Sequence, residues 1–183
     1  MKYITLLRGI NVGGNNKIAM PKLIESFINN SFTDVVTHIN TGNIIFSSTI
    51  DDTIKINSAI EAFILKDFNL EITSITLSEE TFKEILLQTN PAWQNDDNQK
   101  TDIMFLWPQL DNPEVTKELE INKSIETLTY VPGALFWNIK RAFVSSSKLE
   151  KLVGTRKYKF MTVRNINTVR RLLDILDNNQ SKL

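Results

Sequence analysis

Over residues 1–78 the chain alternates short apolar runs with stretches of helical periodicity, in the order strand, helix, strand, strand, helix, strand. Helical repeats begin at Pro21 and at the Asp51-Asp52 pair. The apolar runs span 3–7, 34–39, 44–47 and 70–77. Two helical crossovers separated by a hairpin are typical of the ferredoxin-like fold, so the order predicts an α+β fold.

The second half of the chain repeats this order of elements. We expect strands over 103–107, 125–131, 135–139 and 158–163, and helices after Asn112, Ser147 and Asn165. A polar stretch around Pro91 has little periodicity and separates the halves. The prediction is therefore two ferredoxin-like, pseudo-duplicated α+β halves. They are an N-terminal half over 1–78, a helix and linker over 79–100, and a C-terminal half over 101–183 with a basic segment and the final helix.

Composition excludes several kinds of chemistry. The chain has no Cys and a single His, His38, which excludes a thiolate nucleophile, a disulfide, a cysteine zinc site and a multi-histidine metal site. No nucleophile and base stand in a recognisable arrangement, so the sequence names no catalytic residue, metal ligand or cofactor. Neither a signal peptide nor an apolar run long enough to cross a membrane is present, and we expect a cytoplasmic protein.

The charges are distributed unevenly, although 21 basic and 21 acidic residues cancel overall. The basic segment, Lys140–Arg171, holds ten Lys and Arg against Glu150 alone, so it carries +9 and the rest of the chain −9. Such a division is expected where one region meets an anion or an acidic partner surface. It is also expected of a solvated face that pairs with acidic residues of the same molecule.

Three of the six glycines lie within 9–14, directly after the first strand. Their spacing matches neither the dinucleotide-binding motif nor the P-loop, in which Lys and Ser or Thr directly follow the last glycine. A glycine-rich turn can still present backbone N–H groups to an oxyanion. The alternative is a turn that only connects strand to helix. The candidate ligand-binding residues here are Arg8, Asn11, Gly13, Gly14 and Lys17.

Two further polar segments complete the candidate site. The hairpin turn between the second and third strands contains Asn40, Gly42 and Asn43, and antiparallel pairing of the first and third strands brings it to the same sheet edge as Arg8 and Asn11. In the second half, Thr162, Arg164 and Asn165 lie where a strand leads into a helix. A helix N-terminus beside an Arg favours an anion, whereas Asn165 is equally suited to capping the helix.

The runs Leu6–Gly14, Ile39–Phe46 and Thr162–Thr168 resemble the bacterial family catalogued as domain of unknown function 1697. Ser147-Lys148-Leu149 also resembles the second-half pattern of that family. The resemblance spans essentially the whole chain. The family brings no established reaction, substrate or catalytic residue, and it implies a cytoplasmic bacterial α+β protein whose motifs coincide with the candidate residues.

Three functions are compatible with these features. The leading hypothesis is a protein that binds a phosphate-bearing or other anionic small ligand at the edge formed by 8–17 and 40–43, with Arg164 as a further contact. The second is single-stranded nucleic-acid binding through the basic segment, although the overall pI of about 6.6 is low for that class. The third is a structural or assembly module without catalysis, in which the acidic body of one protomer meets the basic segment of another.

Overall fold

The computed structural model describes residues 1–152 and 154–178, and it is a mixed α+β structure with two four-stranded antiparallel sheets. Two compact units divide the chain: Met1–Lys83 with the chain end from Leu176, and Glu84–Ile175. The chain thus passes between the units twice, after Lys83 and again after Ile175 in the final helix. None of the helices in the described ranges is both long and apolar enough to cross a membrane.

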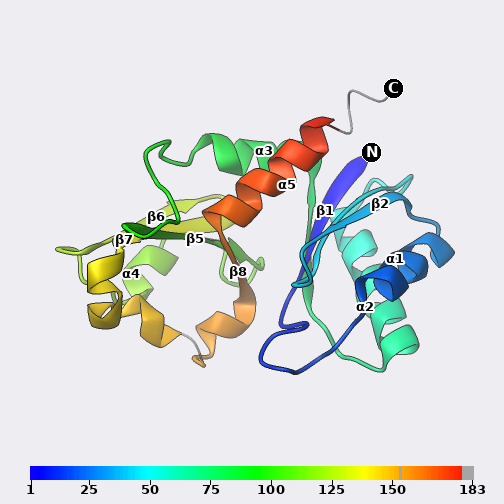
Figure 1. Cartoon of the computed structure of the whole chain (residues 1–183), viewed down its shortest axis with the longest axis horizontal. Helices are drawn as coiled ribbons and strands as arrows, with labels where there is room; N and C mark the ends of the chain where they lie inside the picture. Colours follow the sequence, from blue (N-terminus) through cyan, green and yellow to red (C-terminus); the bar gives the residue numbers. More distant parts are fainter. Residues whose placement is uncertain (153, 179–183) are drawn as a thin grey trace. The chain divides into compact units, whose positions relative to one another are not determined.

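The first unit holds one sheet whose strands lie in the order β2-β3-β1-β4. Helices α1 and α2 cover the same face of it (Figure 1). Helix α3 begins in this unit, directly after β4. The elements are β1 Lys2–Leu7, α1 Met20–Asn29, β2 Thr33–His38, β3 Asn43–Ser47, α2 Thr53–Phe68, β4 Ser74–Ser78 and α3 Glu79–Leu87.

Aromatic side chains fill the core between this sheet and its helices. The ring of Phe27 on α1 lies 5.3 Å from that of Phe46 on β3 and 5.0 Å from that of Phe63 on α2, both edge to face. Helix α2 begins where the Asp52 carboxylate accepts the N–H groups of the next turn, and it ends at Asn69 in the left-handed conformation. The helix that the sequence predicts from the Asp51-Asp52 pair is thus confirmed, with Asp52 as its cap.

The second unit contains the other sheet, with strands in the order β6-β7-β5-β8. Side chains from α4 and from the 3₁₀ turn η2 pack with those of the sheet in one apolar core. The elements are β5 Gln99–Leu106, α4 Val115–Glu118, β6 Glu126–Val131, β7 Ala134–Lys140, η1 Arg141–Ser146, η2 Leu149–Leu152, η3 Lys157–Phe160, β8 Met161–Asn165 and α5 Ile166–Asn178.

The predicted elements differ from the structure mainly in this unit. Where the sequence predicts a short helix after Ser147, the structure has the 3₁₀ turn η2, and the Ser147 hydroxyl donates to Glu126 at 2.6 Å. Strand β8 begins at Met161 rather than at Tyr158, whose N–H donates to the Thr155 hydroxyl at the start of η3. The fourth strand likewise begins at Ser74, later than its apolar pattern indicates.

Candidate functional site

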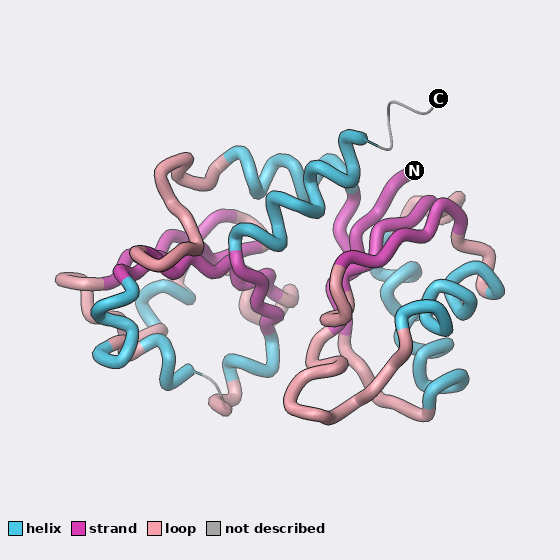
Figure 2. Tube along the Cα trace, in the orientation of Figure 1, coloured by secondary structure: helices cyan, strands magenta, loops and turns pink. Residues whose placement is uncertain are grey.

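A long loop joins β1 to α1 and carries the glycine cluster (Figure 2). Its tip is a tight turn in which Gly13 and Gly14 have φ values of 59° and 81°. The Asn15 N–H donates to the Val12 carbonyl at 3.1 Å, and these two residues form an isolated antiparallel bridge. Two successive positive φ angles define a type I′ turn, which explains why both central positions are glycine.

The Asn11 side chain closes the base of this loop. Its amide nitrogen donates to the carbonyls of Ile18 at 2.9 Å and Asn40 at 2.7 Å, and its oxygen accepts the Ile18 N–H at 2.9 Å. A second asparagine, Asn16, donates to the Gly9 carbonyl at 3.0 Å. The loop is therefore held in one conformation and attached to the turn at Asn40, which lies at the same sheet edge because β1 and β3 pair antiparallel.

The turn between β2 and β3 packs closely against β1. Gly42 has φ 79°, and a Cβ added there would lie 2.7 Å from the Leu7 Cβ. The Leu7 N–H donates to the Gly42 carbonyl at 2.8 Å. Asn43 is fully buried, and its amide donates to the His38 carbonyl at 3.1 Å. Both predicted site residues thus make structural contacts, Gly42 with β1 and Asn43 with the His38 carbonyl.

The charged candidates of this unit lie at the two ends of the loop. Arg8 is partly buried, and its backbone N–H donates to the Thr73 carbonyl at 2.9 Å, which extends the β1–β4 ladder by one residue. Lys17 is exposed, as are Gly13 and Gly14 at the tip. The structure therefore brings the loop and the turn together, and it leaves Lys17 and the glycine tip facing solvent.

Thr162, Arg164 and Asn165 belong to the second unit, on β8. The Arg164 guanidinium donates to the Thr162 hydroxyl at 3.0 Å and to the Val163 carbonyl at 2.9 Å. Burial lowers the pKa of Arg164 to about 10, because the charged form loses solvation. The Asn165 side chain accepts the Thr168 N–H at 2.9 Å, so its predicted role as the cap of α5 is confirmed.

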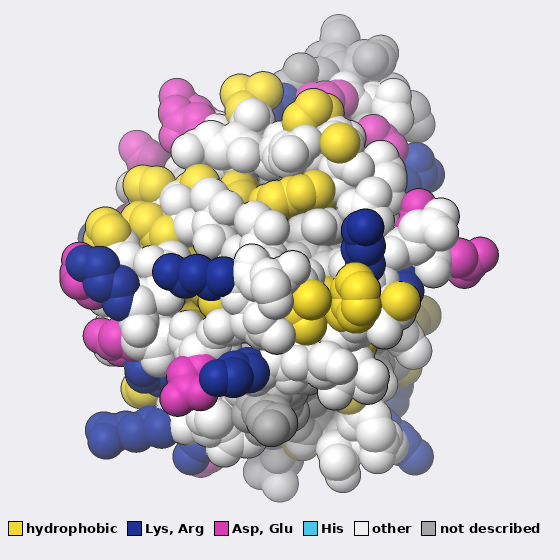
Figure 3. Space-filling view, turned by 90° about the vertical axis from the view of Figure 1, so that its left-hand side faces the viewer, with side chains coloured by type: hydrophobic (Ala, Val, Ile, Leu, Met, Phe, Trp, Pro, Cys, Tyr) yellow, Lys and Arg dark blue, Asp and Glu magenta, His cyan; other side chains and the backbone are white. Residues whose placement is uncertain are grey.

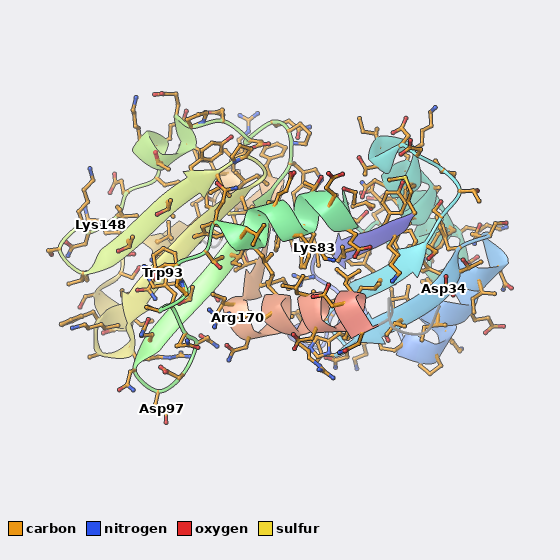
Figure 4. All side chains as sticks on the ribbon, turned by 90° about the horizontal axis from the view of Figure 1, so that it is seen from above. Asp34, Lys83, Trp93, Asp97, Lys148 and Arg170 are labelled. Atoms are coloured by element: carbon orange, nitrogen blue, oxygen red, sulfur yellow. The ribbon has the colours of Figure 1, made fainter. Side chains whose placement is uncertain are left out.

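Several cations of the basic segment contact the polar stretch that precedes β5. Arg141 donates to the Asp96 carbonyl at 2.9 Å, and Arg170 donates to the Trp93 carbonyl at 2.9 Å. Figure 4 shows Arg170 on α5 beside the loop that carries Trp93. On the face drawn in Figure 3, Lys and Arg side chains stand apart, separated by neutral, apolar and acidic groups. Some cations of the basic segment are thus engaged in hydrogen bonds within the chain.

Glu126 is a buried carboxylate that the sequence did not single out. Its oxygens accept the indole N–H of Trp137 at 2.9 Å and the hydroxyl of Ser147 at 2.6 Å. They also accept the backbone N–H groups of Lys148 at 3.0 Å and Asn122 at 3.1 Å. Burial alone would raise the pKa of Glu126, but these hydrogen bonds lower it below its ordinary value of 4.5.

Metal-ligating side chains do not gather anywhere in 1–152 or 154–178: no three His, Asp or Glu residues there are placed to hold an ion. The loop of the first unit offers backbone N–H groups and Lys17, and β8 of the second unit offers Arg164.

Comparison with known proteins agrees with the architecture. The chain is 31% identical to a solved protein described as conserved bacterial protein SP0830 from Streptococcus pneumoniae, with a TM-score of 0.81. That match covers 96% of this chain and 98% of the other. No curated protein matches the chain. A family described as protein of unknown function (DUF1697) matches residues 1–137, three quarters of the length, and the chain therefore belongs to the DUF1697 family.

Proposed function

We propose that the protein binds a small anionic ligand, such as a phosphate-bearing metabolite, at the loop 8–17 of the first unit. The observation that carries the proposal is the loop held by Asn11, with two glycines at its tip. In the described part of the chain, no hydrogen bond uses the N–H of Gly13 or Gly14. A rigid turn with exposed N–H groups binds an oxyanion without first having to order its backbone.

Charged side chains would supply the remaining attraction. Arg8 and Lys17 flank the turn, and a hydrogen bond to a charged partner contributes about 1.5 to 3 kcal/mol. Asn11, Gly42 and Asn43 would act indirectly in this proposal, since their contacts shape the loop and the adjoining turn. Arg164, which lies in the second unit, would offer an anion contact of its own beside the capped start of α5.

We expect Lys17→Ala and Arg8→Ala each to weaken binding of the ligand about tenfold or more. The ligand is first found by thermal shift, with inorganic phosphate, pyrophosphate, nucleotides and sugar phosphates as probes. A ligand at a hundred times its Kd stabilises by about 2.7 kcal/mol, or roughly 5 to 11 °C for a chain of this size. Titration calorimetry then gives Kd for each variant.

The matched control is Lys55→Ala, which removes a cation on α2 whose side chain is 76% exposed and lies in the same unit. Binding should be unchanged in this variant. If both loop variants bind as tightly as the wild type, the loop is not the site. A short single-stranded oligonucleotide in the same panel tests the nucleic-acid alternative, for which log affinity should fall with log salt at a slope of about −0.7 per phosphate contacted.

We also propose that the two units are ferredoxin-like halves of a pseudo-duplicated fold. The support is the equivalent strand order, β2-β3-β1-β4 in one unit and β6-β7-β5-β8 in the other. In each unit the first strand pairs antiparallel with the third and the fourth. An experimental structure in which the two sheets superpose strand for strand would support this proposal, and different strand directions would contradict it.

A further inference from the structure

A cavity of about 480 Å³ lies in the second unit between the end of α4 and the turns η2 and η3. Its floor consists of three leucine side chains: Leu119, Leu149 and Leu152. All three are buried, with exposed fractions of 8% or less, and they belong to the apolar core of this unit. The volume falls within the range of small-molecule sites, which are lined mainly by apolar groups.

Cationic side chains form the rim of the cavity: Lys148, Arg156 and Lys157. Lys148 lies 3.5 Å from a carboxylate oxygen of Glu120, and Lys157 lies 3.0 Å from one of Glu118. These pairs are solvent-exposed, so they hold the lysines only weakly. Arg156 is exposed and takes part in no ion pair within the described residues. Among the side chains that the structure describes, the rim therefore carries one more positive than negative charge.

Hydrogen bonds also hold the backbone of the cavity wall, and the Lys157 ammonium donates to the Glu118 carbonyl at 3.0 Å. The Lys148 N–H donates to the buried Glu126 carboxylate at 3.0 Å, which fixes the chain where it enters the cavity wall. The Thr155 hydroxyl donates to the Leu152 carbonyl at 2.8 Å and accepts the Tyr158 N–H at 3.3 Å, which fixes the turn that carries Arg156. A site with a fixed wall binds a ligand at a lower entropic cost.

A second cavity of about 180 Å³ shares the walls formed by Leu149 and Leu152. Its lining includes the apolar side chains of Met104, Trp137 and Val163, and the charged side chains of Lys100 and Asp102. The leucine floor is therefore flanked by further apolar surface, and the one cation among it, Lys100, is paired with Asp102 at 3.7 Å. A leucine floor with a singly positive rim matches a molecule that has an apolar body and one negative head group.

We infer that this cavity binds a free, single-chain amphipathic anion, in which a hydrocarbon chain covers the leucine floor and a carboxylate or phosphate head meets Arg156 and the two lysines. The hydrocarbon supplies affinity by burying apolar surface, and the head group selects the orientation. This site is separate from the loop 8–17, so the two proposals stand or fall independently.

The test compares three ten-carbon probes at concentrations below those at which they form micelles. They are decanoate, decanol and decyltrimethylammonium, and binding to the full chain is measured by titration calorimetry. We expect decanoate to bind about tenfold or more tightly than decanol, and the cationic probe to bind more weakly than either. Arg156→Ala should weaken decanoate about tenfold and leave decanol unchanged. Because Arg156 is exposed, this variant should fold, which its thermal unfolding checks.

Arg171→Ala is the matched control, because Arg171 is an exposed Arg of the same unit, on α5 and 3.8 Å from Asp174. It should bind decanoate like the wild type. The inference is overturned if decanol binds as tightly as decanoate, if Arg171→Ala and Arg156→Ala lose the same affinity, or if no probe binds. Sedimentation with phosphatidylglycerol vesicles that requires Arg156 would overturn it in favour of a membrane surface.

Discussion

Glu126→Gln should destabilise the protein by about 3 to 4 kcal/mol at pH 7, measured by urea unfolding. The side chain is 4% exposed, and its two oxygens accept four hydrogen bonds, from Trp137, Ser147, Lys148 and Asn122. A glutamine keeps one accepting oxygen and turns an NH₂ group toward donors that then lack an acceptor. The variant loses hydrogen bonds to a charged acceptor and leaves buried donors unsatisfied. These two costs together account for the expected loss in the free energy of unfolding.

The cost of Glu126→Gln should also depend on pH. The folded pKa of Glu126 lies below its ordinary value of 4.5, so the folded state binds the proton less readily than the unfolded state. The stabilisation is therefore complete above the unfolded pKa and is lost as the pH falls through the folded pKa. The difference between wild type and variant should shrink as the pH is lowered from 7 through 4.5 toward 3.

The matched control for this prediction is Glu114→Gln, an exposed glutamate of the same unit whose side chain pairs with Lys117. It should change the free energy of unfolding by less than about 1 kcal/mol. A Glu126→Gln protein as stable as the control would contradict the prediction. A pH-independent difference would mean that packing, rather than the carboxylate charge, accounts for the effect.

Gly42→Ala should cost about 3 kcal/mol, for two separable reasons. At φ 79° an alanine carries a conformational cost of about 1 to 2 kcal/mol. Its Cβ would also lie 2.7 Å from the Leu7 Cβ and 3.1 Å from two atoms of Ile10. Leu7 and Ile10 are fully buried, so they cannot move aside cheaply, and overpacking of this kind costs about 1 to 3 kcal/mol.

Gly9→Ala separates these two contributions. Gly9 has φ 73°, yet a Cβ added there would meet nothing within 4 Å. It should therefore show the conformational cost alone, about 1 to 2 kcal/mol. Thermal or urea unfolding of the two variants measures the difference, which we assign to the contact with β1. Equal destabilisation in both would show that the close packing at Gly42 contributes nothing.

Local patterns predicted the elements around the candidate loop well. The apolar runs 3–7 and 44–47 correspond to β1 and β3, and Pro21 lies in the first turn of α1. Antiparallel pairing of β1 and β3 then places Asn11 beside Asn40, and the structure has a hydrogen bond of 2.7 Å between them. Strand periodicity and turn chemistry act over a few residues, so they can be read without the fold.

Local patterns do not show contacts with residues far away in the chain. Ser147 fits a helix cap in sequence, and the short turn η2 follows it, but the pattern gives no sign that its hydroxyl donates to Glu126, 21 positions earlier. Asn43 is predicted as a ligand-binding residue of the turn, and only the structure shows that its side chain is fully buried and donates to the His38 carbonyl. Burial and the contact with Glu126 depend on how the strands pack, which a local pattern does not contain.

The charges likewise show what the sequence gives and what only the folded chain decides. The sequence establishes a basic segment from Lys140 to Arg171, because counting requires no coordinates. Only the folded chain shows that Arg141 and Arg170 donate to backbone carbonyls near Trp93, while Arg156 stands at the rim of a cavity. Structural propensities and charges are properties of single residues and short segments, so the sequence alone gives them. Which polar groups remain available to a ligand depends on distances in space between residues far apart in the chain, and these distances exist only after folding.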